Sequence, residues 1–251
     1  MQFQEDILLA DIGNSRTKFS YNGSHYSYYN NYLEFDDIHE FIFKLKHKLK
    51  NFVYSSVNKK IECVLVDIMD ELKINHTRAE DLLAKHKKID FSGIEGMGAD
   101  RKLGIIGALK FSEPPFITVD CGTSITINPV KDNKSLGGAI FPDVEMQLKT
   151  LHQLTDALPK VTITDYIVKS GTNTEDAIRY GVLGSVAGGI IYILDDLIRN
   201  NFNGQPPTIF MTGGLADKIS DLIAADYGDV IIDEHLVLKG IENLVQTHII
   251  P

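Results

Sequence analysis

Residues 11–15, with the sequence DIGNS, and residues 120–124, with the sequence DCGTS, form the strongest pattern in this chain. Each stretch follows an apolar run, DILLADI at residues 6–12 and FITV at residues 116–119, that predicts a buried β-strand. One such stretch alone is explained equally well as a β-turn, because Asp, Gly and Asn are common turn residues. Two copies after the same kind of strand indicate a duplicated functional loop. We call them the first and the second DxG loop.

The residue types in the DxG loops suit a bound polyphosphate. A carboxylate at a strand end can hold a cation or its waters, and a glycine lets the main chain approach a phosphate oxygen closely. A third glycine turn, Gly213-Gly214, closes the apolar strand 208–211, where a base or sugar could lie, although a simple strand-to-helix turn is equally compatible. The candidate residues for binding a polyphosphate and an attached base or sugar are Asp11, Ile12, Gly13, Asn14, Ser15, Arg16, Thr17, Lys18, Thr123, Gly213 and Gly214, and the resemblance described below implies that they bind ATP.

A fourth segment, Gly98-Ala99-Asp100-Arg101, places a carboxylate beside a guanidinium at a loop-to-helix junction. Asp100 could accept a proton from a substrate hydroxyl, and Arg101 could clamp a substrate carboxylate with two parallel hydrogen bonds. The alternative is an acidic residue at a helix start beside a surface arginine, which is a common pattern. From these four residues alone, this alternative is favoured over a catalytic role.

Composition limits the classes of function. The chain has 251 residues, a formal net charge of −9 and 43% hydrophobic residues, so it can build a real core, and its acidity argues against broad binding to nucleic acid or to anionic membranes. Cys63 and Cys121 show no paired spacing, which suggests neither a disulfide framework nor a zinc site. We find no apolar stretch of about 18 residues and no signal peptide, and we expect a cytoplasmic protein.

The pattern of turns and apolar periodicity divides the chain into two parts. Glu113-Pro114-Pro115 is the best candidate boundary, giving domains at 1–112 and 113–251. Residues 16–32 predict a hairpin turning at Asn22-Gly23, residues 61–68 fit either a strand or a buried helix, residues 70–86 predict a helix, and residues 135–140 predict a strand.

The strongest helix is predicted at 174–200, with Thr174 as N-cap. Its three glycines (Gly181, Gly184 and Gly188) recur at helical spacing and indicate close approach of another element.

The three glycine-containing turns together resemble the actin/sugar-kinase/Hsp70 (ASKHA) superfamily. The joint motifs are similar to those of the type III pantothenate kinase family, in family order, at residues 11–15, 98–101, 120–123, 137–142, 158–159 and 171–178. The resemblance implies an α/β fold of two RNase H-like domains with an interdomain nucleotide cleft. The activity that it implies is ATP-dependent phosphorylation of pantothenate, the first step of coenzyme A biosynthesis.

The resemblance also implies individual roles. Asp100 resembles the general base for the pantothenate hydroxyl, and Asp120 the carboxylate linked to a monovalent cation, K⁺ or NH₄⁺, with Mg²⁺ on the phosphates. Thr174 matches a threonine that reaches the pantothenate pocket of a partner subunit, which implies a homodimer with shared active sites. The residues implied to bind pantothenate are Gly98, Ala99, Arg101, His152 and Thr174.

Two departures from the family pattern affect the pantothenate side. Pro142-Asp143 stands where the family commonly has Pro-Gly, and residues 91–95 lack the tyrosine and proline often found there. Two alternative functions therefore stay open: an ASKHA kinase for another small hydroxyl substrate, and a non-catalytic relative that serves as an accessory factor. Retention of Asp100, Arg101 and both DxG loops favours an enzyme.

Overall fold

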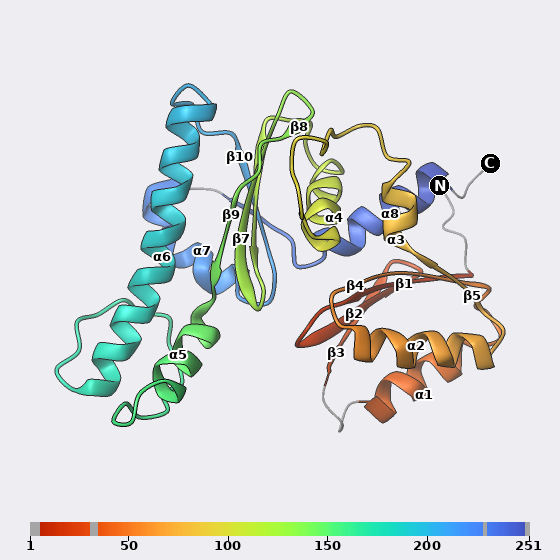
Figure 1. Cartoon of the computed structure of the whole chain (residues 1–251), viewed down its shortest axis with the longest axis horizontal. Helices are drawn as coiled ribbons and strands as arrows, with labels where there is room; N and C mark the ends of the chain where they lie inside the picture. Colours follow the sequence, from red (N-terminus) through yellow and green to blue (C-terminus); the bar gives the residue numbers. More distant parts are fainter. Residues whose placement is uncertain (1–5, 31–34, 228–229, 249–251) are drawn as a thin grey trace. The chain divides into compact units, whose positions relative to one another are not determined.

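The structure, a computed structural model, describes residues 6–30, 35–227 and 230–248. The chain forms two compact units (Figure 1). The first unit comprises the chain up to Ile89, Glu95–Phe111 and the segment from Leu236 onward, and the second comprises Asp90–Ile94 and Ser112–His235. Each unit contains one DxG loop, so the repeated motif corresponds to a repeated structural unit.

The first unit is built on a sheet with the strand order β3-β2-β1-β4-β5. The strands β1, β2 and β3 pair antiparallel in sequence, whereas β4 and β5 continue the sheet parallel to β1. The predicted hairpin at Asn22-Gly23 is confirmed: both residues have positive φ (50° and 76°), as a tight hairpin turn requires. The strands are β1 (Ile7–Ile12), β2 (Arg16–Tyr21), β3 (Ser24–Tyr29), β4 (Asn51–Ser56) and β5 (Asn75–Arg78).

Helices cover both faces of this sheet (Figure 1). On one face, the helices α1 (Phe35–Leu45) and α2 (Lys59–Glu71) bury their apolar sides against alternate residues of β1, such as Leu8 and Ala10. On the other face lie α3 (Ala79–Leu83), α4 (Ala99–Ala108) and α8 (Leu236–His248). Residues 61–68, for which strand and helix were both open, belong to α2.

The helix predicted at residues 70–86 is wrong, because the chain reverses after α2. Lys73 adopts a left-handed conformation (φ 58°), and the Ile74 N–H donates to the Met69 carbonyl at 2.8 Å. The chain then enters strand β5 and the short helix α3. Glycine in a sequence predicts a left-handed turn, but lysine does not, so the turn at Lys73 could not be predicted from the sequence.

The second unit repeats the arrangement, with the order β11-β10-β6-β7-β8 and with β9 also paired to β7. Here β6 and β7 pair antiparallel, while β10 and β11 run parallel to β6. The predicted strand at 135–140 is wrong: two short strands are separated by Gly137 and Gly138, which have φ of 97° and 140°. The strands are β6 (Phe116–Cys121), β7 (Ser124–Lys131), β8 (Lys134–Ser135), β9 (Ala139–Pro142), β10 (Thr208–Thr212) and β11 (Ile231–Ile232).

The core of the second unit forms between this sheet and the helices α5 (Val144–Gln153), α6 (Thr174–Asn201) and α7 (Ala216–Tyr227). Helix α6 begins after Asn173, whose side chain accepts a hydrogen bond from the Asp176 N–H at 2.9 Å. Asn173 is therefore the N-cap, and the prediction that Thr174 has this role is wrong by one residue. Thr174 is the first residue of the helix and is exposed.

The last helix, α8, packs with the first unit, whereas the sequence placed it with residues 113–251. Helix α8 crosses α4, and at the crossing the main chains of the two helices are in direct contact. A Cβ atom on Gly107 would lie 1.9 Å from the Leu236 carbonyl oxygen, and one on Gly240 would lie 2.0 Å from the Leu103 oxygen. No side chain fits at either position, so the two glycines permit the crossing.

Helix α6 is long and apolar enough to cross a membrane by length and composition, which corrects the expectation that no such stretch exists. Only 33% of its most apolar window is buried. A long core helix passes the same test, so this observation is weak evidence for a membrane span. The large hydrophobic side chains that this helix exposes are those of Tyr180 and Tyr192.

Candidate active site

The first DxG loop connects β1 to β2 and is closed by its own main chain. The Gly13 N–H donates to the Arg16 carbonyl at 2.9 Å, and the strand register pairs Asp11 with Lys18. A Cβ atom on Gly13 would lie 2.9 Å from that same carbonyl oxygen, closer than real Cβ contacts. The turn therefore requires glycine. Asn14 and Ser15 are exposed at its tip.

Two asparagines that the sequence analysis did not single out hold this loop in place. The Asn30 side chain donates to the carbonyls of Gly13 (2.8 Å) and Asn14 (3.4 Å), and its main-chain N–H donates to the Ser15 carbonyl (2.9 Å). Asn58, the N-cap of α2, donates to the Asn14 carbonyl at 3.4 Å. Asn30 directly follows β3, so only the hairpin register could have placed it beside the loop.

The structure separates the predicted ATP-binding residues of this segment into two groups. The side chains of Ile12 and Thr17 are buried, and the Thr17 hydroxyl donates to Asn30 Oδ1 at 2.7 Å. Any contact of these two residues with a nucleotide is therefore through main-chain atoms. The Arg16 guanidinium lies over the Tyr29 ring, 4.2 Å from its centre. Asp11, Gly13, Asn14, Ser15 and Lys18 are at least partly exposed.

The second DxG loop lies against the Gly213-Gly214 turn, because β6 and β10 are parallel neighbours that pair Asp120 with Thr212. Gly213 has φ 93°, and a Cβ atom there would lie 2.5 Å from the Cys121 carbonyl carbon and 2.7 Å from Asp120 Oδ1. The Leu215 N–H donates to the Cys121 carbonyl at 3.2 Å. The structure thus brings two predicted nucleotide contacts together at the carboxyl ends of parallel strands, where α/β sheets bind ligands.

Buried acidic and thiol groups adjoin this second loop. Burial, together with the charges of Asp120 and Asp143, raises the pKa of the Cys121 thiol, which makes this cysteine a core residue and not a nucleophile. Asp143 follows β9, whose Pro142 pairs with Ser124, and its carboxylate accepts from the Met146 N–H at 2.7 Å as the N-cap of α5. Burial raises the pKa of Asp143, partly opposed by that hydrogen bond.

The predicted catalytic segment lies at the start of α4. Gly98 is the N-cap position, and Asp100 Oδ1 accepts from the Arg101 N–H at 2.8 Å. A Cβ atom on Gly98 would lie 2.4 Å from that oxygen, so glycine leaves room for the carboxylate. Burial lowers the pKa of Arg101, partly opposed by Asp100, but a guanidinium remains charged at neutral pH.

The two predicted pantothenate contacts of the second unit, His152 and Thr174, lie on α5 and α6, which pack against each other. His152 Nδ1 lies 3.0 Å from the Leu158 carbonyl oxygen. In the neutral ring, this contact assigns the proton to Nδ1 and leaves Nε2 as an acceptor.

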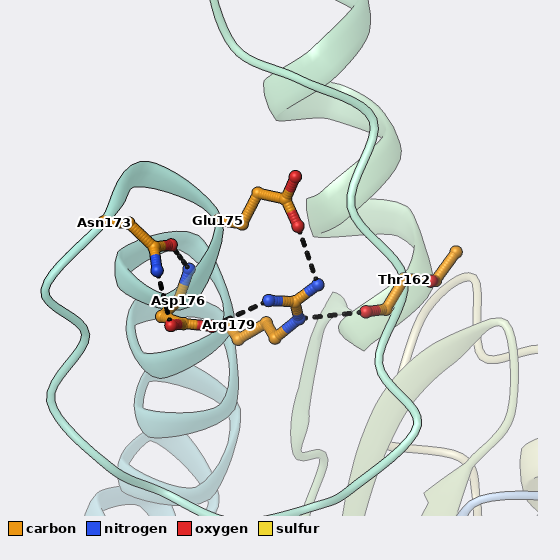
Figure 2. Close-up of polar contacts among 5 residues, drawn as sticks. All are labelled: Thr162, Asn173, Glu175, Asp176 and Arg179. Carbon is orange, nitrogen blue, oxygen red and sulfur yellow. Dashed lines mark hydrogen bonds and ion pairs between the residues drawn. The ribbon is translucent and has the colours of Figure 1, made fainter.

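A cluster of polar side chains fixes the helix end that carries Thr174 (Figure 2). Arg179 donates to Glu175 (3.0 Å), to Asp176 (2.8 Å) and to the carbonyl of Thr162 (3.1 Å), so it joins the first turn of α6 to the preceding segment. Gly171 allows that segment to pass close, since a Cβ atom there would lie 2.3 Å from the Ala177 nitrogen. The sequence analysis did not identify these side chains as a support for the start of α6.

Among residues 6–30, 35–227 and 230–248, no group of three or more His, Cys, Asp and Glu side chains is arranged to hold a metal ion. The single carboxylates Asp11 and Asp120 stand at strand ends and are half-buried. Mg²⁺ in phosphate sites is commonly held by one or two carboxylates plus substrate phosphates. Each of these carboxylates, within its own unit, therefore suits a metal that is bound together with nucleotide phosphates.

Solved structures share this fold at low sequence identity. A Campylobacter jejuni protein named as a Baf family transcriptional activator has a TM-score of 0.62 at 22% identity, covering 96% of this chain and 98% of that one. A Sinorhizobium meliloti protein named as a 2-dehydro-3-deoxygalactonokinase has a TM-score of 0.60 at 9% identity, with coverage of 96% and 98%. The two α/β units of related topology, each with a DxG loop, confirm the predicted ASKHA fold of two related domains, and the nucleotide cleft between the domains stays a prediction.

Sequence comparison identifies the family. The family model of type III pantothenate kinase matches residues 7–196, and the chain belongs to that family. The type III pantothenate kinase of Thermosipho africanus is 29% identical over 94% of this chain and 96% of its own length. That of Synechococcus elongatus is 36% identical over 60% of this chain, and the match spans 60% of the relative's own length.

Proposed function

We propose that this chain transfers the γ-phosphoryl group of ATP to the hydroxyl of pantothenate and forms 4′-phosphopantothenate. The observation that carries the proposal is the start of α4, where Gly98 leaves room for the Asp100 carboxylate within a chain that belongs to the pantothenate kinase family. Asp100 is a partly exposed carboxylate on a rigid helix end, which suits a general base. Ala99 and Arg101 flank it, and Arg101 can clamp the pantothenate carboxylate.

For ATP, we assign the phosphates to the two DxG loops. The first loop offers Asn14, Ser15 and Lys18, the second offers Thr123, and Gly213-Gly214 accommodates the adenosine. When bound, Mg²⁺ would neutralise negative charge on the phosphates. Asp11 offers a carboxylate for a cation on the first loop and Asp120 offers one on the second, and we place a K⁺ or NH₄⁺ ion beside Asp120. Phosphoryl transfer depends mainly on positioning and charge, which agrees with a site built from glycine turns and isolated charges.

The outer face of α6 supports the homodimer. Cβ atoms on Gly181, Gly184 and Gly188 would meet nothing within 4 Å in the described part of the chain, so the close approach expected from the sequence does not occur there. Tyr180 and Tyr192 flank the glycines and are 44% and 74% exposed. We assign this face to α6 of a second copy, which would carry Thr174 toward a neighbouring pantothenate site, and we assign His152 to pantothenate as well. We also infer a cytoplasmic location, where ATP is available.

The test is pantothenate-dependent release of ADP, measured with and without K⁺. The Asp100→Asn variant should lower kcat by about 10²- to 10⁴-fold without changing the unfolding temperature. Absence of pantothenate-dependent turnover by the folded wild type would refute the kinase assignment. Unchanged kcat in Asp100→Asn would remove the base, and a fully active monomer in light scattering would contradict the shared site.

The two alternatives give different results in the same experiment. An ASKHA kinase for another small hydroxyl compound would release ADP with a member of a sugar panel and not with pantothenate. A non-catalytic accessory factor would give no turnover with any acceptor. The structural similarity to the Campylobacter jejuni protein concerns the fold alone, because the two chains are 22% identical.

A further inference from the structure

Asn30 makes more contacts with the first DxG loop than its place after β3 would require. Its main-chain N–H and its side-chain amide together reach three successive carbonyls, those of Gly13, Asn14 and Ser15. Its Oδ1 accepts the hydroxyl of Thr17 at 2.7 Å. Carbonyl oxygens can only accept hydrogen bonds, so these contacts require the amide nitrogen to face the loop, and Oδ1 accepts the hydroxyl of the buried Thr17 on its other side. The amide nitrogen is therefore held toward the carbonyls.

These contacts determine which way the peptide groups of the loop point. In a trans peptide unit, the carbonyl and the N–H of the next residue point in opposite directions. With the carbonyls of Gly13 and Asn14 turned toward Asn30, the N–H groups of Asn14 and Ser15 are directed away from it. Main-chain N–H groups attract a phosphate, whereas carbonyl oxygens repel it. The orientation of two peptide units thus decides whether this loop accepts or rejects an anion.

We propose that Asn30 is a positioning residue for the ATP phosphates: it holds the carbonyls of the first DxG loop away from the nucleotide. The inference rests on the proposed function of that loop. Asn30 itself touches the loop and takes no part in the transfer. Asn58, with one contact at 3.4 Å to the Asn14 carbonyl, is a weaker support of the same loop.

The variant Asn30→Asp is the sharpest test, because it keeps the shape and the acceptor for Thr17 but replaces the donor with a negative charge. We expect the KM for ATP to rise about tenfold or more, and the KM for pantothenate to stay within about twofold. Asn22→Asp is the matched control: it makes the same change at the other end of the hairpin, at the turn, and should leave both constants unchanged. Thermal unfolding of all variants is measured alongside.

A second variant guards against misfolding of the first. Thr17→Val keeps the volume but removes the hydroxyl that donates to Asn30 Oδ1 and so helps to hold the amide in place, and we expect it to raise the KM for ATP by about threefold. An unchanged KM for ATP in folded Asn30→Asp would overturn the inference. So would a parallel change in both KM values together with a lowered unfolding temperature, because this pattern describes a purely structural residue.

Calorimetric titration with ATP separates this inference from the proposed function. If the wild type binds ATP but does not phosphorylate pantothenate, the kinase proposal fails, and the ATP affinities of Asn30→Asp and Asn22→Asp still decide the role of Asn30. A loss of affinity confined to Asn30→Asp supports it. Equal affinities refute it. If the wild type does not bind ATP, both proposals fail.

Discussion

The two DxG loops have the same sequence pattern and the same place in their sheets, yet they are held by different means. Side chains reach the first loop from outside, with Asn30 and Asn58 donating to its carbonyls. The second loop is packed main chain to main chain against Gly213, at distances that exclude any side chain. Removing one side-chain support should therefore destabilise the first loop only partly. A side chain at Gly213 should disrupt the packing of the second loop altogether.

Of the two loops, the larger effect is expected in the second, where the glycine contact is closer. Gly213→Ala forces a Cβ atom to within 2.5 Å of Cys121 at a residue with φ 93°, and we expect a loss of about 3 kcal/mol or more in the free energy of unfolding. Gly214→Ala is the matched control, because a Cβ atom there meets nothing within 4 Å in the described part of the chain. Urea denaturation measures both. Equal stability of the two variants would contradict the account of the second loop.

Gly13→Ala makes the corresponding change in the first loop and should have an intermediate effect. Its Cβ atom would approach one carbonyl oxygen at 2.9 Å, with no positive φ to aggravate the strain. We expect a loss of about 1 to 2 kcal/mol in the free energy of unfolding, because the side-chain supports can follow a small shift of the turn. If this variant were as damaging as Gly213→Ala in urea denaturation, the contrast between the loops would be wrong.

The smallest effect concerns the acid beside the second loop. The pKa of Asp143 is raised by burial, so the folded state holds its proton more tightly than the unfolded state does. Its contribution to stability is complete below the ordinary carboxyl pKa and is lost as pH rises through the folded value. Asp143→Asn keeps a good N-cap but has no carboxyl group to titrate, so it should remove the loss of stability with rising pH.

The measurement for Asp143 is the difference in the free energy of unfolding between the wild type and Asp143→Asn at a series of pH values from acid to neutral. The difference should move in favour of the variant as pH rises. A difference that stays constant, or that moves in favour of the wild type, would show that the carboxylate is not disfavoured in the folded state.

The sequence predicted the parts of this molecule that are local. The DxG loops were identifiable because the acid, the glycine and the preceding strand are contiguous. Gly13 meets a close contact within its own turn, and the contact of these loops with a phosphate stays a prediction. Asn30 was not identifiable, because its partners lie across a hairpin whose register the sequence leaves open. Helix α8 was assigned to the wrong side of the boundary for the same reason: its glycine contact joins Gly240 to residues far earlier in the chain.

The crossing of α4 and α8 has a consequence for the way this polypeptide is made. Translation delivers α4, the helix that bears Asp100, well before α8, and residues 112–235 emerge between them. The second unit can complete its core while the first unit still lacks α8. The unit whose synthesis starts first is therefore the last to complete its fold. Contacts between distant segments form slowly and leave apolar surface open to aggregation in the interval. Loss of the final helix would therefore damage the N-terminal half of the chain, including the start of α4, more than the half that it follows in sequence.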